Sequence, residues 1–294
     1  MSLSQQVSIS IASKDRHEVL EETLRKIHAF GLGDYPVIVC DDGSEPAMQP
    51  EALGLFADAT LLRNEQATGQ ALARNRIAEV CKTPYLLQLD DDSYPVAGSL
   101  EKLVETVEAE DNWLAVAIPF EEPARGRCFP EKANTSGVIV LSAFVGCSVL
   151  LHVERFKRLG GYAEWIGRCV EEEELCVRSF LQGMRVIQLD SLKIRHEVTA
   201  VARSNKAICY RSFRNWTATW LLCAPPLLLP LCLLRMFALS LLDLMKNRRL
   251  ESVTGLLAGI RLFVGLSSYG TRLSLVEYRR YRGLPHALSL FNQH

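Results

Sequence analysis

The sequence predicts an α/β protein with a mostly parallel central sheet, followed by a helical and apolar C-terminal appendage. Short apolar runs of strand length alternate with segments of helical periodicity from the first residues onward. Strands that alternate with helices form parallel sheets through right-handed crossovers. Residues 204–294 break this pattern, because they are rich in Leu and Arg and contain few acidic side chains.

The first part of the chain alternates strand and helix regularly. We expect strands at 7–12, 36–40, 59–62 and 85–89, and helices at 19–30 and 71–80. Pro84 and Pro95 bracket the fourth strand, whose nearly continuous apolar character is typical of a strand covered on both faces.

The same alternation continues to residue 196. We expect, in order, a helix at 100–107, a strand at 114–118, a loop at 121–134, an apolar run at 138–149, a turn at 160–161, a helix from 171 to 181, a strand at 185–189 and a polar segment at 193–196. These elements complete a body that is long enough to bury a sizeable core.

Charge divides the chain more clearly than length does. The net charge is −1, which indicates no particular partner, and we do not expect the protein to bind nucleic acid. Residues 203–294 contain 13 Lys or Arg and 3 Asp or Glu, whereas residues 1–202 contain 20 basic and 31 acidic side chains. We therefore expect a catalytic domain at 1–203 and a basic, Leu-rich helical region at 204–294.

The nine cysteines indicate a reducing compartment. Their number is odd, they are scattered, and no pair has the CxxC spacing of a zinc site or redox motif. The N-terminus has no basic segment followed by an apolar one, so a secretory signal is not expected. Buried, reduced thiols in the cytoplasm are the simplest interpretation.

The C-terminal region contains a stretch that is apolar enough to meet a membrane. Residues 216–234 carry no charge, but Pro225, Pro226 and Pro230 argue against one straight spanning helix. A broken hydrophobic hairpin at the membrane interface, followed by an amphipathic helix at 255–266, fits the pattern better. Basic residues that would contact anionic head groups are Lys246, Arg248, Arg249, Arg279, Arg280 and Arg282. The alternative is that these helices pack on the body or on a second copy of the chain.

Three consecutive carboxylates follow the strand at 85–89. Asp90, Asp91 and Asp92 repel one another unless a cation lies among them, and hard divalent cations prefer such oxygen ligands. Open α/β sheets bind their ligands at this end of the strands. The sequence alone leaves a solvated acidic turn as the alternative.

Other motifs lie at the ends of expected strands or just beyond. They are Ser8 to Ser13 followed by Arg16, Asp41-Asp42-Gly43-Ser44, Gly69 with Ala73-Arg74-Asn75, Asp90-Asp91-Asp92, Gly146, Gly160-Gly161-Tyr162, and Glu171 to Glu174 with Leu175, Arg178 and Gly183. In this order and spacing the chain resembles the inverting family 2 glycosyltransferases over residues 7–215, including rhamnosyltransferase-like bacterial members. The resemblance implies a GT-A nucleotide-sugar-binding fold and transfer of a sugar from a nucleoside-diphosphate sugar to a glycan or lipid-linked acceptor.

The resemblance also implies how the nucleotide is held. The implied nucleotide-binding residues are Ala12, Arg16, Asp41, Asp42, Gly69, Arg74, Asp90 and Asp91. Asp90 is expected to approach the ribose and Arg74 to contact nucleotide or phosphate, a solvated helix residue being the alternative for Arg74. Asp91 has no individual role in this scheme, and Arg203 is a further candidate for a phosphate contact.

A divalent metal, Mg²⁺ or Mn²⁺, is implied as the cofactor. Asp90-x-Asp92 matches the DXD motif of the family, in which Asp92 binds the metal that bridges the diphosphate. His196 lies where similar enzymes often have a His near the metal, although a surface His satisfied by other partners is the alternative. Such a metal would neutralise charge that builds on the leaving group.

The implied general base is Glu172. An inverting displacement needs a base for the acceptor hydroxyl, and the family places it second in an acidic pair at a helix start. The chain is aligned with the family motif through Glu174-Leu175 and Arg178. Because four Glu residues are consecutive, Glu171 is the second choice for the base. A neighbouring carboxylate is expected to raise the pKa of the base.

Two other classes of function remain open at this stage. One is a nucleotidyltransferase that makes nucleotide sugars, although Ser13-Lys14-Asp15-Arg16 lacks the Gly-rich loop that it needs. The other is a non-catalytic nucleotide-binding membrane protein, which would be expected to lack some of the carboxylates. The resemblance favours an enzyme of cell-surface polysaccharide synthesis, in the cytoplasm or peripheral on the cytoplasmic face of the inner membrane.

Overall fold

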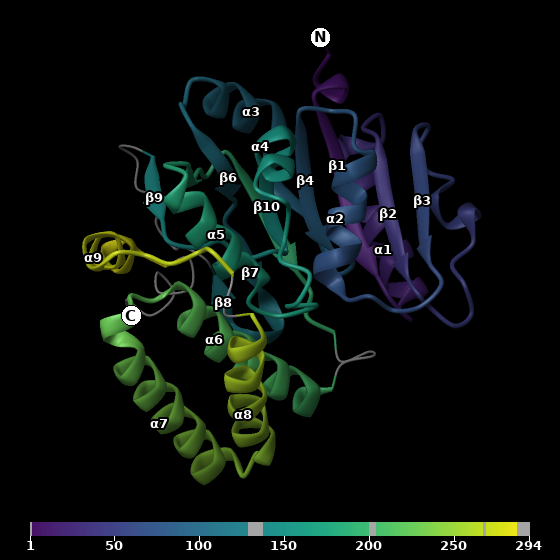
Figure 1. The fold of residues 1–294 in the computed structure, drawn as a ribbon. Helices are drawn as coiled ribbons and strands as arrows, with labels where there is room; N and C mark the ends of the chain where they lie inside the picture. The colour runs from purple at the N-terminus through teal and green to yellow at the C-terminus, as the bar shows by residue number, and fades with distance from the viewer. Residues whose placement is uncertain (1, 129–137, 200–203, 267–268, 287–294) are drawn as a thin grey trace.

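The computed structural model describes residues 2–128, 138–199, 204–266 and 269–286 (Figure 1). Two sheets form the body, and the helices α6, α7 and α8 lie together beneath the carboxyl ends of the strands of the larger sheet (Figure 1). The candidate active site lies between this edge and the C-terminal helices.

The larger sheet has eight strands in the order β3-β2-β1-β4-β10-β6-β11-β9. The strands are β1 (Val7–Ser13), β2 (Val37–Asp42), β3 (Ala59–Asn64), β4 (Tyr85–Asp90), β6 (Trp113–Ala117), β9 (Ile139–Leu141), β10 (Ser148–His152) and β11 (Arg185–Gln188). β10 pairs antiparallel with β4 and β6, and β9 pairs antiparallel with β11, whereas the remaining pairs are parallel. The predicted α/β fold with a mostly parallel sheet is confirmed.

The smaller sheet was not predicted. It contains β5 (Ser93–Gly98), β12 (Leu192–His196), β7 (Phe120–Glu122) and β8 (Arg127–Cys128) in that order. The predicted loop at 121–134 is therefore wrong for its first part, because pairing with distant β12 makes a strand of a segment without a local signal. Residues 129–134 of that loop lie outside the described residues. The pairing of β12 with β5 places His196 opposite Ser93.

Helices cover the larger sheet and extend the chain beyond it. They are α1 (His17–Ile27), α2 (Gln70–Val80), α3 (Leu100–Glu108), α4 (Val153–Arg158), α5 (Glu171–Leu181), α6 (Asn205–Cys223), α7 (Leu229–Asn247), α8 (Leu250–Gly265) and α9 (Leu275–Gly283). The short helices α4 and α9 were not predicted from the sequence. The central strands are almost completely buried, as their apolar composition predicts.

The apolar stretch 216–234 bends where its prolines occur. α6 ends at Cys223 before Pro225 and Pro226, and α7 begins after them, so no straight helix covers this stretch. Pro226–Asn247 is long and apolar enough to cross a membrane, and only 11% of its most apolar window is buried.

The C-terminal region also contacts the body. The hydroxyl of Tyr281 donates to the Ser142 carbonyl (2.6 Å), and the Tyr269 hydroxyl lies 2.9 Å from Glu174 on α5. Part of this region therefore packs on the body, whereas membrane contact stays a prediction. The expected division at residue 203 lies in the undescribed segment 200–203 and stays a prediction.

Candidate active site

Parallel pairing brings the ends of three strands to one edge. Ala12 of β1 lies opposite Asp90 of β4, and Ser13 lies opposite Asp41 of β2. A cleft of ≈ 520 Å³ opens at this edge, a size that suits a small-molecule ligand. Of the expected nucleotide-binding residues, those that line it are Ala12, Arg16, Asp42, Gly69, Asp90 and Asp91.

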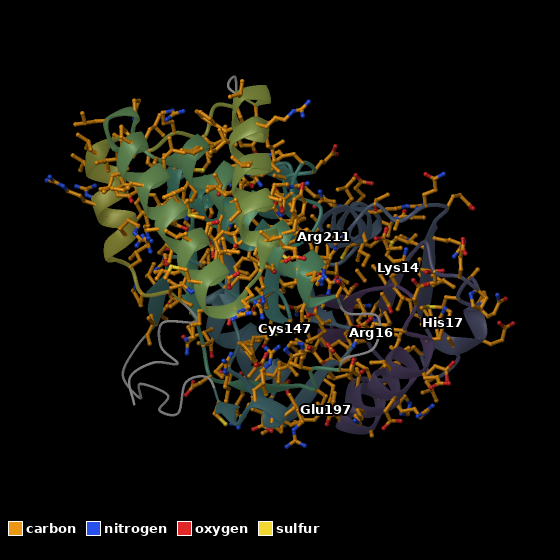
Figure 2. All side chains as sticks on the ribbon, turned by 90° about the horizontal axis from the view of Figure 1, so that it is seen from below. Lys14, Arg16, His17, Cys147, Glu197 and Arg211 are labelled. Atoms are coloured by element: carbon orange, nitrogen blue, oxygen red, sulfur yellow. The ribbon has the colours of Figure 1, made fainter. Side chains whose placement is uncertain are left out.

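Basic side chains from opposite parts of the chain face this cleft. Lys14 and Arg16 come from the segment after β1, while Arg211 comes from α6, and Figure 2, which views this edge from below, labels all three. The cleft is therefore bordered by positive charge as well as by the carboxylates of β4.

Asp41 and Asp42 hold loops in place. Asp41 is fully buried and accepts hydrogen bonds from the backbone amides of Ser44 (2.9 Å) and Met48 (3.0 Å). Asp42 accepts from the amides of Thr68 and Gly69, both at 2.8 Å. Burial alone would raise the pKa of both carboxyls, but these hydrogen bonds lower it. Asp42 lines the cleft, whereas Asp41 does not.

Asp91 faces back toward β1 and α1. It pairs with the Arg16 guanidinium and accepts a hydrogen bond from the Ser13 hydroxyl (2.7 Å), while its backbone carbonyl accepts from Thr23 (2.8 Å). Burial raises the pKa of Asp91 to about 6 although Arg16 opposes this shift. Asp91, for which the resemblance implied no individual role, thus anchors the acidic triplet to the first strand and helix.

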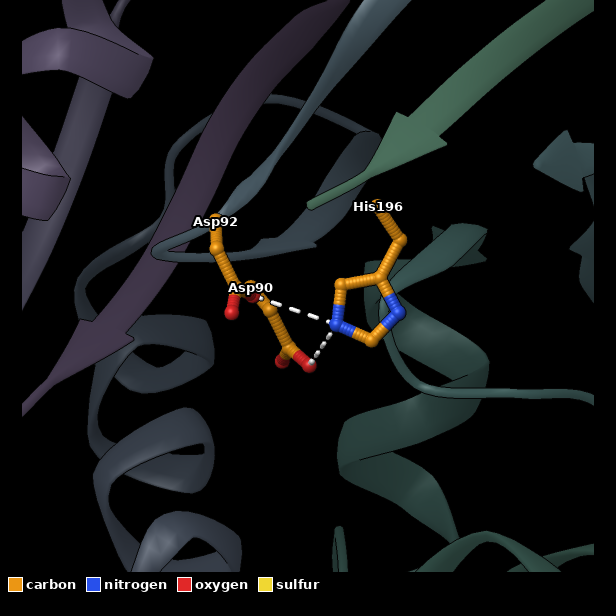
Figure 3. A group of neighbouring side chains, drawn as sticks. All are labelled: Asp90, Asp92 and His196. Carbon is orange, nitrogen blue, oxygen red and sulfur yellow. Dashed lines mark ion pairs between the residues drawn. The ribbon is translucent and has the colours of Figure 1, made fainter. Parts of the chain in front are cut away.

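Asp90, Asp92 and His196 form a cluster of side chains of the kinds that bind metal ions (Figure 3). The Nε2 atom of His196 lies 3.1 Å from Asp92 and 3.9 Å from Asp90, and one ligand atom from each residue lies within 4.8 Å of the others. On the opposite side of the ring, Nδ1 lies 3.0 Å from Glu122. A carboxylate at the far nitrogen is the arrangement that orients metal-binding imidazoles, so the donor set suits a divalent cation.

Glu122 was not predicted from the sequence, because its position beside His196 depends on the pairing of β7 with β12. Burial disfavours a charged His196, but Asp92, Cys147 and Glu122 outweigh it and raise its pKa above the usual range. His196 and Arg16 in turn lower the pKa of Asp92 despite its burial.

Arg74 connects this cluster to the start of α5. Its guanidinium lies 2.8 Å from Asp90 and 3.2 Å from both Glu171 and Glu172. Arg74 is 2% exposed and does not line the cleft, so the structure places it among carboxylates and away from solvent. Burial opposes its charge, but the surrounding carboxylates raise its pKa. Its expected contact with the nucleotide stays a prediction.

Glu171 and Glu172 occupy different surroundings. The side chain of Glu171 is 2% exposed and that of Glu172 is 17% exposed. Burial, strengthened by the charge of Glu172, raises the pKa of Glu171 to about 8, and burial also raises the pKa of Glu172. Gly146 leaves the room for this cluster, since a Cβ there would lie 2.0 Å from Glu172 Oε1.

The backbone just before α5 adopts an unusual conformation. Cys169 and Val170 have φ values of 71° and 74°, which side chains other than Gly rarely adopt. The Asn215 amide on α6 donates to the carbonyls of Ile166 (3.1 Å), Arg168 (2.9 Å) and Cys169 (2.8 Å), which holds this turn in place. Asn215 was missed as a site-supporting residue, because nothing local in the sequence links α6 to this turn.

The remaining carboxylates of the run have other partners. Glu174 is fully buried and pairs with Arg178 (2.6 Å), whereas Glu173 accepts a hydrogen bond from the Trp216 indole (3.1 Å). Arg203, the further candidate, lies outside the described residues. The first two carboxylates of the run are therefore the ones that join the Arg74 cluster.

The chain is similar to known glycosyltransferases in sequence and in fold. Residues 8–140 match the family described as Glycosyl transferase family 2. The uncharacterized glycosyltransferase YwdF of Bacillus subtilis is 26% identical over 147 residues, covering 47% of this chain and 55% of that protein. The glucosyl-dolichyl phosphate glucuronosyltransferase of Haloferax volcanii is 23% identical over 229 residues, covering 70% of this chain and 73% of that protein.

A solved structure, GalNAc-T7 with UDP, GalNAc and Mn²⁺, has a similar fold, with a TM-score of 0.62 at 13% identity. The similarity covers 98% of this chain and 56% of that one, so the chain spans about half the length of GalNAc-T7 and of the Bacillus protein. The fold is GT-A-like. The match to the family 2 glycosyltransferases covers residues 8–140, a little under half of the chain.

Proposed function

We propose that the protein transfers a sugar from a nucleoside-diphosphate sugar to an acceptor hydroxyl in a single, inverting displacement. The observation that carries this proposal is the position of Asp90, which belongs to the metal-ligand cluster and contacts Arg74, the partner of Glu172. A site for the leaving diphosphate and a candidate base are thereby separated by one guanidinium group. This spacing suits attack and departure on opposite sides of one anomeric carbon.

Asp90, Asp92 and His196 would hold the divalent cation. Two carboxylates and an oriented imidazole suit Mn²⁺ or Mg²⁺, and GalNAc-T7 has its UDP together with Mn²⁺. When bound, the cation supplies Lewis-acid stabilisation of the leaving diphosphate. Lys14 and Arg211 at the cleft add positive charge for the same anion.

Ala12, Arg16, Asp42 and Gly69 border the space proposed for the nucleoside. Gly69 has a φ of 99°, and a Cβ there would lie 2.7 Å from the Gly167 carbonyl, so only glycine fits this position. The backbone at Gly69 can therefore approach the turn before α5 closely, which closes one side of the cleft.

Glu172 is the proposed base. It takes the proton of the acceptor hydroxyl while the hydroxyl oxygen bonds to the anomeric carbon, and the bond to the diphosphate breaks with its electron pair. Glu172 is more exposed than Glu171, which favours it as the group that meets an acceptor. Glu171 stays the second choice, and Arg74 keeps both carboxylates near Asp90.

The C-terminal region supports a place at a membrane surface. Large apolar side chains on α7 are exposed, including Leu231 (62%), Leu234 (64%) and Met245 (71%), and basic residues border the same region. We propose peripheral attachment at the cytoplasmic face of the inner membrane and a role in cell-surface polysaccharide synthesis. A rhamnosyl donor and a homodimer remain expectations.

Calorimetry with UDP or GDP and Mn²⁺ tests the donor site. We expect Asp92→Asn to weaken metal-dependent binding of the preferred nucleotide by at least about tenfold, because a charged metal ligand is lost. Glu172→Gln should bind that nucleotide like the wild type but lose transfer by about 10²-fold or more. Unchanged binding by Asp92→Asn would contradict the metal site, and loss of transfer in Glu171→Gln alone would move the base by one residue.

A further inference from the structure

A second cavity lies beside the start of α5. This groove has a volume of ≈ 560 Å³ between α6, α7 and α9, and aromatic and aliphatic side chains dominate its wall. Its lining includes Trp216, Trp220, Leu231, Met236, Leu239 and Tyr278. Nothing in the proposed transfer of a sugar from a nucleotide explains an apolar groove of this size.

The groove reaches the first turn of α5, and the donor cleft reaches the segment that precedes this helix. Trp165 and Arg168, which precede α5, line the donor cleft, whereas Glu173, which follows Glu172, lines the groove. The Trp216 indole donates to Glu173, which ties the groove wall to the first turn of α5. Glu172 itself lines neither cavity, so an acceptor held in the groove would extend past Glu173 to meet it.

Two cations border the groove. Arg235 of α7 and Arg282 of α9 both line it and are exposed, and neither has an ion-pair partner among the residues that the structure describes. Arg282 lies 5.4 Å from the Trp220 ring, which holds its charge beside the apolar wall. The combination suits a ligand with an apolar chain and an anionic head.

The groove continues onto the exposed apolar face of α7. Leu231 and Leu239 line the groove and are 62% and 39% exposed, while Leu234 and Phe237 on the same helix are 64% and 57% exposed. A chain that leaves the groove over this face would remain in contact with apolar side chains. A free sugar or a soluble glycan would not use such a surface.

We infer that the groove binds an acceptor carried on a long-chain lipid phosphate, with the chain along α7 and the phosphate near Arg235 and Arg282. This inference rests on the proposed function and names its acceptor class. The acceptor hydroxyl gives its proton to Glu172 and bonds to the anomeric carbon, and the nucleoside diphosphate leaves with the electron pair of the broken bond.

Calorimetry on the full chain with farnesyl phosphate, a soluble isoprenyl phosphate, tests the inference. We expect it to bind at least about tenfold more tightly than inorganic phosphate or farnesol, because only farnesyl phosphate has both the chain and the charge. Arg235→Glu combined with Arg282→Glu should weaken its binding by about tenfold or more, and so should Leu239→Glu.

Two matched variants control for changes outside the groove. Arg279→Glu on α9 and Leu55→Glu on the body alter residues that do not line the groove and should bind farnesyl phosphate like the wild type. Binding of UDP or GDP with Mn²⁺ reports that each variant is folded. Equal binding of farnesyl phosphate and inorganic phosphate, or wild-type binding by the groove variants, would overturn the inference.

The same measurements separate this inference from the proposed function. Asp92→Asn should lose metal-dependent nucleotide binding but keep farnesyl phosphate binding, since Asp92 belongs to the cleft cluster and not to the groove. If Asp92→Asn keeps nucleotide binding, the donor site is wrong while the groove stands. If nucleotide binding behaves as expected and farnesyl phosphate does not bind, the groove inference alone fails.

Discussion

Single residues in this site differ by their surroundings more than by their type. Asp90 faces His196 and Arg74, whereas its neighbour Asp91 turns back to Arg16 and β1. Likewise Glu171 is almost completely buried and Glu172 is partly exposed. Adjacent carboxylates with opposite orientation can therefore serve structure and chemistry separately.

The raised pKa of Glu171 predicts how stability depends on pH. Its pKa is about 8 in the folded state and near its ordinary value of 4.5 when unfolded, so the folded state holds the extra proton. This contribution to stability is complete below about pH 4.5 and is lost as pH rises through about 8. Between pH 5 and 9 we expect the free energy of unfolding to fall less for Glu171→Gln than for the wild type. The difference should be about 1.4 kcal/mol for each pKa unit by which folding raises the pKa of Glu171.

Urea unfolding of both proteins at several pH values measures this difference. Glu173→Gln is a suitable control, because its carboxylate lies outside the Arg74 cluster. Parallel stability curves for wild type and Glu171→Gln would show that the buried carboxyl does not retain its proton in the folded state.

At the scale of elements, α6 supports the turn before α5 as well as the C-terminal helices. Asn215 holds three carbonyls of that turn, and Gly259 of α8 lies so close to α6 that a Cβ would be 2.5 Å from the Arg214 carbonyl. The helix therefore connects the donor cleft, the candidate base and the apolar tail. Removal of the tail would be expected to disturb the site.

Asn215→Ala tests this connection. The substitution leaves one buried and two partly buried carbonyls of the turn without their donor, at a cost of about 1–3 kcal/mol in the free energy of unfolding. We expect thermal unfolding at lower temperature and transfer activity reduced about tenfold or more, because the start of α5 is less firmly positioned. Asn247→Ala, on an exposed residue at the end of α7, should change neither measurement by much. Full activity of Asn215→Ala would mean that the turn is held without it.

At the scale of the whole molecule, an acidic body joins a basic tail with an exposed apolar helix. The tail does not lie on the body with its apolar face, since Leu227, Leu234 and Phe237 are all exposed. Contact with a lipid surface would cover these side chains and bring the basic residues near anionic head groups.

Flotation with phosphatidylglycerol vesicles measures that contact. We expect the protein to float with these vesicles at low salt, and Leu234→Glu combined with Phe237→Glu to reduce the bound fraction several-fold, because two apolar contacts are replaced by charge. Phosphatidylcholine vesicles and the variant Leu55→Glu, exposed on the body, are the controls. Recovery of wild-type protein entirely in the unbound fraction would contradict attachment through α7.

The sequence by itself determined the alternation of strands and helices, the acidic ends of the strands and the break in the apolar tail. These features depend on local periodicity and on proline, which short segments reveal without their neighbours. It therefore predicted that Asp42 and Asp90 share one edge, since parallel strands end together.

Only the tertiary structure decided which of these groups meet. β5 and β7 become strands through pairing with β12, and this pairing places His196 between Asp92 and Glu122. Arg74 reaches Glu171 and Glu172 across almost a hundred residues of sequence. Such contacts follow from the packing of distant segments, for which the local pattern of apolar and polar residues holds no signal.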